Sequence, residues 1–221
     1  MEIKVRKQQG KLIVFEGIDG SGKATQAKLL FNYLKKRKVA VEEIAFPRYD
    51  TIHGQVVKRM LQGEFGKSVN PYLACLPFAL DRLMARDMIK NWLAQDKLVI
   101  ADRYVTASMV HLSAFLPQDK QQRKFMDWVA ILEYQIHGLP LENLVVLLKV
   151  PARLSQKLMV KKDMVEKDLI YQKRVYNQYQ QMAKKFGHWV VVECVDKKEE
   201  ILPKSEVHQR VLEALKRRKI I

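Results

Sequence analysis

The stretch FEGIDGSGKATQ, residues 15–26, directly follows a short apolar run at residues 12–15. Gly17, Gly22 and Lys23 fit the spacing G-x-x-x-x-G-K of a phosphate-binding loop. Such a loop needs a strand before it and a helix after it, because backbone N–H groups and the amino end of the helix must face the same anion. The apolar run and the helical pattern that follows meet this need. The stretch therefore predicts an α/β fold built around a phosphate-binding loop, in preference to a plain glycine-rich turn.

The rest of the chain repeats the same alternation of strand and helix. Short, nearly continuous Val- and Ile-rich runs are typical of strands in a parallel sheet that is covered on both faces. The predicted strands are residues 11–16, 39–46, 97–101, 143–149 and 189–194. The predicted helices are residues 23–37, 53–62, 71–95, 106–115, 121–137, 152–186 with a break near 161–165, and 207–219. Pro77 predicts a kink or a split in the third helix.

These elements predict one domain over residues 1–221, with residues 1–10 as an N-terminal extension. The fold class is α/β, a three-layer P-loop NTPase fold with a five-stranded parallel sheet flanked by helices on both faces. We find no repeat, linker or low-complexity segment that would divide the chain.

Composition limits the partners. The 221 residues carry 40 basic and 24 acidic side chains, a formal charge of +16, which favours an anionic partner such as a nucleotide or a nucleic acid. A lysine-rich solvated surface is the plainer explanation for most of this charge. No apolar run reaches the roughly 18 residues of a membrane span, and the N-terminus has no signal-peptide pattern. Cys75 and Cys194 have no metal-ligand spacing, so we expect a reducing, cytoplasmic protein without a membrane partner.

Ala24 departs from the usual loop, in which a Ser or Thr hydroxyl after the lysine ligates Mg²⁺. Thr25 is one residue further, about 100° around the helix, and cannot take the same position. The pair Ala24-Thr25 is similar to the arrangement in adenylate kinases, which hold the metal largely through water. We therefore expect ATP and Mg²⁺ to bind, with the metal held through water by Asp102 and weakly by Thr25. The expected ATP-binding residues are Gly17, Ile18, Asp19, Gly20, Ser21, Gly22, Lys23, Ala24 and Thr25.

Asp102 and Arg103 end the third predicted strand, at the carboxyl edge of the sheet where ligands of α/β proteins bind. A carboxylate there can hold Mg²⁺ through water, and the arginine can neutralise a phosphoryl group. The structural alternative is a local ion pair that caps the strand.

Phe78, Asp81 and Arg82 share one face of the third helix. Phe78 can stack on a base while Arg82 reaches its phosphate with two N–H donors. The structural alternative is a core phenylalanine and a surface arginine.

Four motifs, in this order, resemble the thymidylate kinase family: FEGIDGSGK, FPRYD (46–50), FALDR (78–82) and DRYVTAS (102–108). The segments HGQVVKRMLQGEFG, ILEYQIHGLP and DMVEKDLIYQKRVYNQY agree as well, so the resemblance covers roughly residues 11–185. It implies transfer of phosphate from ATP to dTMP, giving dTDP, and a dimer through the helices at 53–62, 71–95 and 104–116.

The resemblance also assigns roles to residues. Asp19 resembles the aspartate that meets the sugar 3′-hydroxyl, and Arg103 resembles the arginine that binds the phosphates. The implied substrate-binding residues are Asp19, Phe46, Pro47, Arg48, Tyr49, Phe78, Arg82, Arg103, Ser108 and His111. The implied catalytic residues are Lys23, Arg103, Asp19, Arg153, Lys161 and Lys162, the last three in a short helical lid at about 153–168.

Some positions depart from the family pattern. Ser108 replaces the usual asparagine that can face the pyrimidine edge, and Leu112 replaces a glutamine, which bears on base selectivity. The lid carries lysines where a catalytic arginine is usual, and Arg153 is the arginine nearest to it.

Two other functions stay open at this point. One is a kinase for another nucleoside monophosphate, or for a deoxynucleoside, in which case Glu16 is the loop-side candidate for a general base. The other is a nucleic-acid-binding P-loop ATPase, which only the charge of +16 supports. We expect nucleotides and a second copy of the chain as partners, and no nucleic acid.

Overall fold

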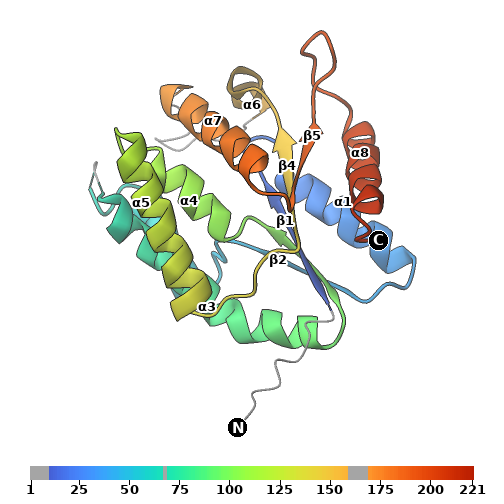
Figure 1. Ribbon diagram of the computed structural model, residues 1–221, viewed down its shortest axis with the longest axis horizontal. Helices are drawn as coiled ribbons and strands as arrows, with labels where there is room; N and C mark the ends of the chain where they lie inside the picture. The colour runs from blue at the N-terminus through green and yellow to red at the C-terminus, as the bar shows by residue number, and fades with distance from the viewer. Residues whose placement is uncertain (1–9, 67–68, 159–168) are drawn as a thin grey trace.

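The computed structural model describes residues 10–66, 69–158 and 169–221 (Figure 1). Its centre is a five-stranded parallel sheet in the order β2-β3-β1-β4-β5. The strands are β1 (Lys11–Glu16), β2 (Val41–Ala45), β3 (Leu98–Asp102), β4 (Leu144–Lys149) and β5 (Trp189–Glu193). The chain crosses from β1 over β3 to β2, and from β3 over β1 to β4, so the direction of winding changes between β1 and β3. In open α/β sheets, ligands bind at the carboxyl ends of the strands beside such a change.

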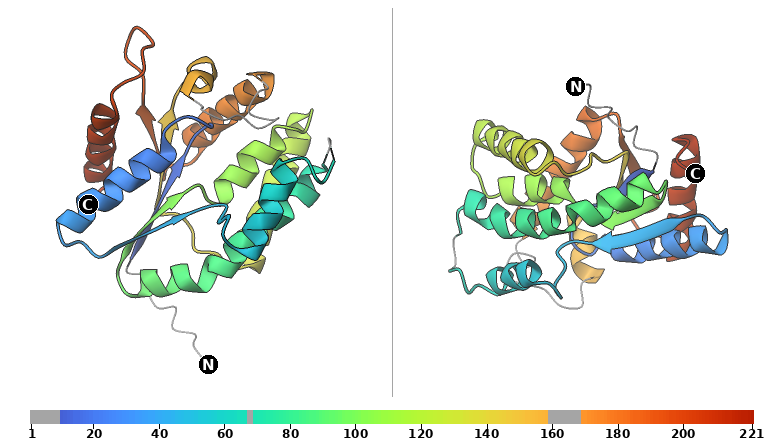
Figure 2. Two further views of the ribbon diagram at one scale, coloured as in Figure 1. Left: turned by 180° about the vertical axis from the view of Figure 1, so that it is seen from behind. Right: turned by 90° about the horizontal axis from the view of Figure 1, so that it is seen from below.

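Helices cover both faces of the sheet. They are α1 (Lys23–Lys36), α2 (Ile52–Leu61), α3 (Pro71–Ala94), α4 (Val105–Ser113), α5 (Asp119–Ala130), the π-helix η1 (Ile131–Ile136), α6 (Ala152–Leu158), α7 (Leu169–Lys185) and α8 (Lys204–Arg217). α1 and α8 lie on one face, and α3, α4, α5 and α7 lie on the other (Figures 1 and 2). The predicted three-layer fold is confirmed.

The central strand shows how the sequence builds two cores. Leu12 and Val14 of β1 pack into the core under α3, α4 and α7, while Ile13 and Phe15 pack into the core under α1 and α8. All four side chains are fully buried. Successive side chains of a strand point to opposite faces, so a strand that is apolar at every position needs a helical layer on each side.

The structure differs from the sequence prediction in three helices. α3 runs unbroken through Pro77, so the predicted split is absent; packing of α3 against α2, α4 and β3 offsets the one backbone hydrogen bond that a proline removes. The helix predicted at 121–137 begins at Asp119 and changes to π-helical geometry from Ile131 to Ile136. The helix predicted at 152–186 is two helices, α6 and α7; the expected break near 161–165 lies outside the described residues, as do residues 1–9 of the expected N-terminal extension.

Within the described ranges, no helix combines the length and the apolar character needed to cross a bilayer.

Close packing fixes the segment between β2 and α2. A Cβ atom at Gly54 would lie 1.7 Å from the carbonyl oxygen of Arg48 and 2.9 Å from the backbone nitrogen of Tyr49. Thr51 caps the helix, because its hydroxyl oxygen accepts the Gly54 N–H at 3.1 Å and lies 2.8 Å from the Arg48 carbonyl oxygen. The amino end of α2 therefore packs directly against the segment after Phe46 and fixes the backbone conformation of that segment.

We expect Gly54→Ala to destabilise the protein, because the added methyl group forces the segment after Phe46 away from α2. Overpacking of this kind costs about 1–3 kcal/mol, which lowers the melting temperature of a domain of this size by at least a few degrees. Thermal unfolding followed by circular dichroism measures this, with Lys58→Ala on the exposed side of α2 as the control. An unchanged melting temperature in Gly54→Ala would contradict the clash.

Candidate active site

The amino end of α1 lacks the usual helix cap. Gly22 is the N-cap residue, with φ of 88°, and no side chain caps the first turn. The first turn also has no acidic residue, and it contains the cation of Lys23 instead. The first N–H groups of a helix need an acceptor, and the positive end of the helix dipole favours a negative charge. An anion such as a phosphate satisfies both requirements, so this helix end is built to bind one.

Gly17 and Lys23 shape the loop itself. Gly17 has φ of 144°, and a Cβ atom there would lie 2.7 Å from the Leu148 carbonyl oxygen, so only glycine fits. The ammonium group of Lys23 donates to the carbonyl oxygens of Gly17 at 3.0 Å and Ile18 at 2.9 Å. Burial, reinforced by the nearby positive charge of Arg103, lowers the pKa of Lys23 to about 8. Lys23 therefore stays protonated at pH 7 and can face a phosphate.

The loop and β3 together offer oxygen atoms that suit Mg²⁺. Asp102 Oδ1 and Ser21 Oγ are both buried and have no hydrogen-bond partner in the described part of the chain. An orphaned carboxylate oxygen beside a phosphate-binding loop fits a metal that keeps several water ligands, as Mg²⁺ does. No cluster of three or more side chains that could hold a metal ion occurs among the described residues. Thr25 is partly exposed in the first turn of α1.

Asp19 and Arg103 form an ion pair between the phosphate-binding loop and the end of β3. Burial alone would raise the pKa of Asp19, but the positive charges of Arg103 and Lys23 hold that pKa well below its usual range. Arg103 has a left-handed backbone, with φ of 64°, and its N–H donates to the Phe15 carbonyl oxygen at 3.0 Å. This conformation costs a non-glycine residue about 1–2 kcal/mol, and it turns the guanidinium toward the loop.

A cavity of about 450 Å³ begins at this ion pair and extends between α2, α3 and α4. Nucleotide-sized ligands bind in cavities of this size, which are mostly apolar and carry a few placed polar groups. The structure brings all the predicted substrate-binding residues except Arg48 to its wall: Asp19, Phe46, Pro47, Tyr49, Phe78, Arg82, Arg103, Ser108 and His111. Leu112 lines it too.

Arg82 lies at the deep end of the cavity and is fully buried. Its Nε and Nη2 donate to the two carboxylate oxygens of Glu133 at 2.6 and 2.7 Å, Nη2 also donates to Ser108 Oγ at 2.6 Å, and Nη1 donates to the Tyr104 carbonyl oxygen at 3.2 Å. The bidentate pair neutralises the guanidinium and commits most of its donors. This geometry places Arg82 with Ser108, the residue predicted to face the base, and does not favour the predicted contact of Arg82 with a phosphate.

Arg48 is the predicted substrate residue that the structure keeps away from the cavity wall. Its backbone N–H and Nε donate to the Asp81 carboxylate at 2.8 and 3.0 Å, and its Nη2 donates to the Asp81 carbonyl oxygen at 2.7 Å. Asp81 is completely buried. In this arrangement Arg48 ties the segment after β2 to α3.

Of the three predicted catalytic residues of the lid, Arg153 lies in the described part of the chain. Arg153 on α6 forms an ion pair with Glu199 at 2.8 Å, and both side chains are largely exposed. Lys161 and Lys162 lie outside the described residues. Their predicted catalytic roles stay predictions.

His111 and Tyr171 hold Arg103 through Nη1, the guanidinium nitrogen that does not pair with Asp19. Arg103 Nη1 lies 3.0 Å from His111 Nε2, and His111 Nδ1 lies 3.2 Å from the Tyr171 hydroxyl, which donates to the His111 carbonyl oxygen at 3.0 Å. Arginine cannot accept a hydrogen bond, so Nε2 must accept and the proton of the neutral ring lies on Nδ1. Burial, together with the charge of Arg103, lowers the pKa of His111 to about 3. The ring therefore stays neutral and keeps this arrangement at physiological pH.

Glu16 is unsuited to act as a general base. It is fully buried, and its carboxylate accepts the Tyr104 N–H at 3.2 Å, the Thr106 hydroxyl at 2.7 Å and the Tyr179 hydroxyl at 2.7 Å. Glu16 does not line the 450 Å³ cavity, so it cannot take a proton from an acceptor bound there.

The family model for thymidylate kinase matches residues 15–211. The chain belongs to the thymidylate kinase family. It is 31% identical over 195 residues to the thymidylate kinase of Plasmodium falciparum (isolate 3D7), covering 88% of this chain and 87% of that protein. It is 30% identical over 199 residues to the probable thymidylate kinase of Thermococcus onnurineus (strain NA1), covering 86% and 92% of the two chains. Members of this family are nucleoside monophosphate kinases, so the chain is an enzyme of that class.

Among solved structures, the thymidylate kinase from Candida albicans is similar, with a TM-score of 0.79 over 96% of this chain and 93% of that one. The sequence identity is 23%, so this likeness shows the fold.

The sequence did not reveal two residues that hold the arginines of the cavity. They are Glu133, which binds Arg82, and Tyr171, which holds Arg103 through His111. Glu133 lies on the π-helical turn, and an acid at the end of a helix gives no sign in the sequence that it is buried against an arginine. Tyr171 lies in a segment that resembled the family but carried no assigned role. The available signal was the spacing of Tyr171, Val175 and Tyr179, which places two hydroxyl groups on the face of α7 that carries its apolar residues, and buried tyrosine hydroxyls need hydrogen-bond partners.

We expect Tyr171→Phe to lower kcat about fivefold and to leave the KM for ATP unchanged. The substitution keeps the ring that stacks on Phe115, with centroids 4.7 Å apart, and removes only the hydroxyl that fixes His111 and, through it, Arg103. One hydrogen bond contributes about 1 kcal/mol, which is about fivefold in rate. Steady-state kinetics measure the effect, and Tyr176→Phe on the same helix is the matched control. A normal kcat with a lowered melting temperature would show that the hydroxyl serves only the fold.

Proposed function

We propose that this chain transfers the γ-phosphoryl group of ATP to dTMP, forming ADP and dTDP. One observation carries the proposal: the ion pair of Asp19 and Arg103 belongs to both the phosphate-binding loop and the 450 Å³ cavity. A triphosphate on the loop and a monophosphate in the cavity would therefore meet at Arg103. Membership in the thymidylate kinase family supports dTMP as the acceptor.

The chemistry needs no general base. The second pKa of a phosphate monoester is near 6, so the attacking oxygen of the acceptor is already anionic at pH 7. The barrier lies in charge repulsion and alignment, which positioned cations reduce. In our proposal Lys23 holds the phosphates of ATP, and Arg103 holds the phosphate of the acceptor and the transferring group. Mg²⁺, held through water by Asp102, would supply further neutralisation of charge.

The base end of the cavity suits a pyrimidine. Phe78, Phe46 and Pro47 provide flat apolar walls against which a ring can stack. Ser108 accepts a hydrogen bond from Arg82, so its own hydroxyl hydrogen remains available to donate to a carbonyl group of the base. Serine offers one such group, whereas an asparagine would offer a donor and an acceptor, so discrimination between dTMP and dUMP should be modest.

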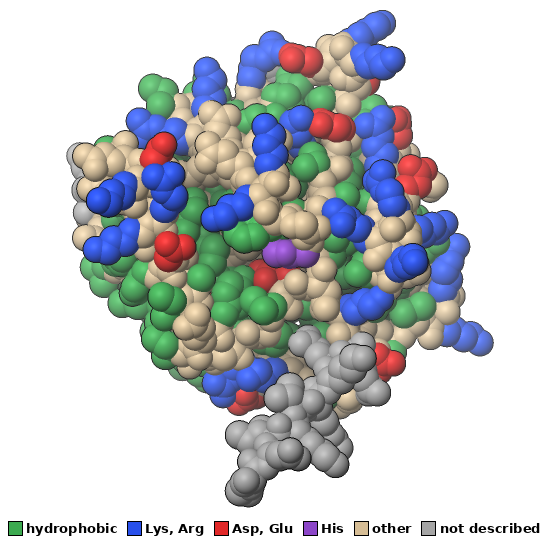
Figure 3. All heavy atoms as spheres, viewed as in Figure 1, with side chains coloured by type: hydrophobic (Ala, Val, Ile, Leu, Met, Phe, Trp, Pro, Cys, Tyr) green, Lys and Arg blue, Asp and Glu red, His purple; other side chains and the backbone are tan. Residues whose placement is uncertain are grey.

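The other candidate functions have less support. A deoxynucleoside acceptor would need a base, and the hydrogen bonds and burial of Glu16 speak against the one candidate. Nucleic-acid binding would need a concentrated basic surface. Lys and Arg side chains are instead spread over the face shown in Figure 3, and are densest over α8 and α1, away from the cavity. Cys75 and Cys194 are buried free thiols, which supports a cytoplasmic location.

We expect dTMP to be the best acceptor in a panel of nucleoside monophosphates assayed with Mg-ATP, with dUMP close behind and purine monophosphates poor. The physical reasons are the apolar walls that Phe78 and Pro47 form and the single hydroxyl group of Ser108. Formation of ADP, corrected for hydrolysis without acceptor, gives kcat/KM for each nucleotide.

Lys23→Ala is the matched control for this panel, because it removes the charge at the loop and leaves the cavity intact. It should abolish transfer to every acceptor while dTMP still raises the melting temperature. A purine monophosphate as the best acceptor, or normal turnover by Lys23→Ala, would contradict the proposal.

We also propose a homodimer formed through α3. Leu73, Leu76, Leu80, Met84 and Met88 are all exposed and follow one stripe along this helix. In the view from behind, α2 and α3 lie on the side of the molecule away from α8 (Figure 2). An apolar stripe four turns long is unusual on the surface of a monomer, and a second copy of α3 would cover it with side chains of the same kind.

Met84→Glu should convert the protein to a monomer, since it places two like charges in the middle of the self-complementary stripe. Sedimentation velocity measures the mass in solution. Ile201→Glu, an equally charged change in the loop before α8, should leave the dimer intact. A monomeric wild-type protein would contradict the dimer, and a dimeric Met84→Glu variant would place the interface elsewhere.

A further inference from the structure

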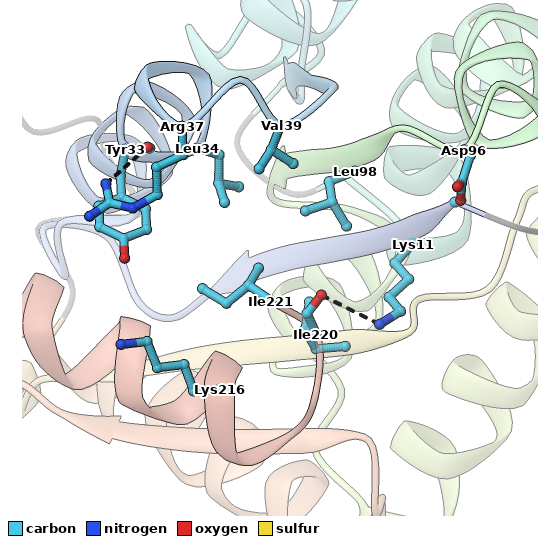
Figure 4. Close-up of a pocket in the computed structure, with 11 residues that line it drawn as sticks. Lys11, Tyr33, Leu34, Arg37, Val39, Asp96, Leu98, Lys216, Ile220 and Ile221 are labelled. Carbon is cyan, nitrogen blue, oxygen red and sulfur yellow. Dashed lines mark hydrogen bonds between the residues drawn. The ribbon is translucent and has the colours of Figure 1, made fainter.

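A second cavity, of about 460 Å³, lies at the amino edge of the sheet, the edge opposite the phosphate-binding loop (Figure 4). We call it the amino-edge pocket. Its walls come from the starts of β1 and β3, the last turns of α1 and α8, and the chain that follows each helix. The lining residues are Gly10, Lys11, Tyr33, Leu34, Arg37, Val39, Asp96, Leu98, Lys216, Ile220 and Ile221. Its volume is within the range of small-molecule sites.

The floor of the amino-edge pocket is aliphatic. The side chains of Leu34, Val39 and Leu98 point toward Ile221 from three different elements (Figure 4). Ile220 and Ile221 pack against the core under α1 and α8 and remain partly exposed. Lys11 fixes this part of the chain, because its ammonium group donates to the carbonyl oxygen of Lys219 at 2.7 Å. A ligand could therefore bury an apolar body here without displacing a helix.

The rim is cationic and largely unpaired. Arg37 and Lys216 form no ion pair within the described residues. The Arg37 guanidinium lies over the Tyr33 ring, 3.7 Å from its centroid. Lys216 and the Tyr33 hydroxyl lie on the same side of the pocket (Figure 4). An anionic group would find two charges and a hydroxyl donor at this rim.

The charge of the pocket limits the size of the anion. α1 and α8 both end here, and the negative ends of their dipoles account for some of the cations. Asp96 also lines the pocket. These negative groups disfavour a polyanion such as a nucleoside triphosphate, for which the uncapped amino end of α1 is the better site. A single negative charge on an apolar body meets both the aliphatic floor and the cationic rim.

We propose that the amino-edge pocket binds an organic monoanion with an apolar body, such as a medium-chain carboxylate. The head group lies at Lys216 and Arg37, and the alkyl chain lies against Leu34, Val39 and Leu98. The amino-edge pocket lies at the edge of the sheet opposite the phosphate-binding loop. Binding of an anion there does not use the nucleotide site, so the proposal does not depend on the proposed function.

The test uses decanoate as the ligand and the fluorescent anion 8-anilinonaphthalene-1-sulfonate as the reporter. The full chain is saturated with dTMP and a nonhydrolysable ATP analogue, so that the nucleotide site is occupied. Decanoate should displace the reporter, whereas decanol and decylamine, which have the same chain length but no negative charge, should displace it at least tenfold less well.

Two variants and one control locate the site. Val39→Trp fills the pocket, and Lys216→Glu reverses the charge at the rim; each should weaken decanoate binding at least tenfold. Lys36→Glu makes the same charge change on α1 at a residue that does not line the pocket, and should change binding less than twofold. Unchanged melting temperature and kinase turnover show that each variant is folded.

Three results would overturn the proposal. Equal displacement by decanol would show that the negative charge is not recognised. Equal weakening by Lys216→Glu and Lys36→Glu would show that only the overall charge matters. Normal binding by Val39→Trp would place the decanoate outside the amino-edge pocket.

Discussion

The uncapped amino end of α1 is the constraint on which the rest of the site depends. A chain normally satisfies the first N–H groups of a helix with a Ser, Thr, Asp or Asn cap, and this chain places Gly22 there and adds the cation of Lys23 to the same turn. Both choices cost stability unless an anion binds. The cost is concentrated at one point, beside the change of winding between β1 and β3, and the carboxyl end of β3 brings Asp102 and Arg103 to that point.

Two ion pairs lie near this point, and they leave different amounts of arginine charge available to a ligand. Glu133 holds Arg82 with both carboxylate oxygens in a fully buried site, so little of the arginine's charge remains for a ligand. Asp19 and Arg103 each keep about a fifth of their side-chain surface exposed, and Arg103 is shared between Asp19 and the neutral ring of His111. Arg103 can therefore exchange part of its pairing for a phosphate. Two arginines that look equivalent in the sequence differ in function because of their partners.

The fold was largely predictable, because each strand is apolar at nearly every position and the loop of residues 17–23 fixes what lies on either side of it. It was also predictable that Asp19, Phe46, Pro47 and Arg103 would lie together, since motifs at the carboxyl ends of β1, β2 and β3 must meet at one edge of the sheet. Details that depend on tertiary packing were not. Pro77 leaves α3 unbroken, Arg48 turns to Asp81, and Glu133 reaches Arg82 from a π-helical turn. None of these has a sequence period or spacing, because each follows from which side chain fills a particular buried space.

α7 shows how the packing of one helix can fix the position of a side chain at the cavity wall. Tyr179 reaches the buried carboxylate of Glu16 at the end of β1, and Tyr171 reaches His111 at the cavity wall. Eight residues separate the two tyrosines, which is about 12 Å along a helix. The contact at Tyr179 is completely buried and fixes one point of α7 on the sheet, while the contact at Tyr171 lies at the end nearer the start of the helix. A tilt of α7 about the fixed point would therefore move Tyr171 most, and with it the histidine that holds Arg103. This explains why the inner face of α7 carries polar side chains where an apolar stripe would pack as well: their hydrogen bonds tie the position of Arg103 to the position of this helix.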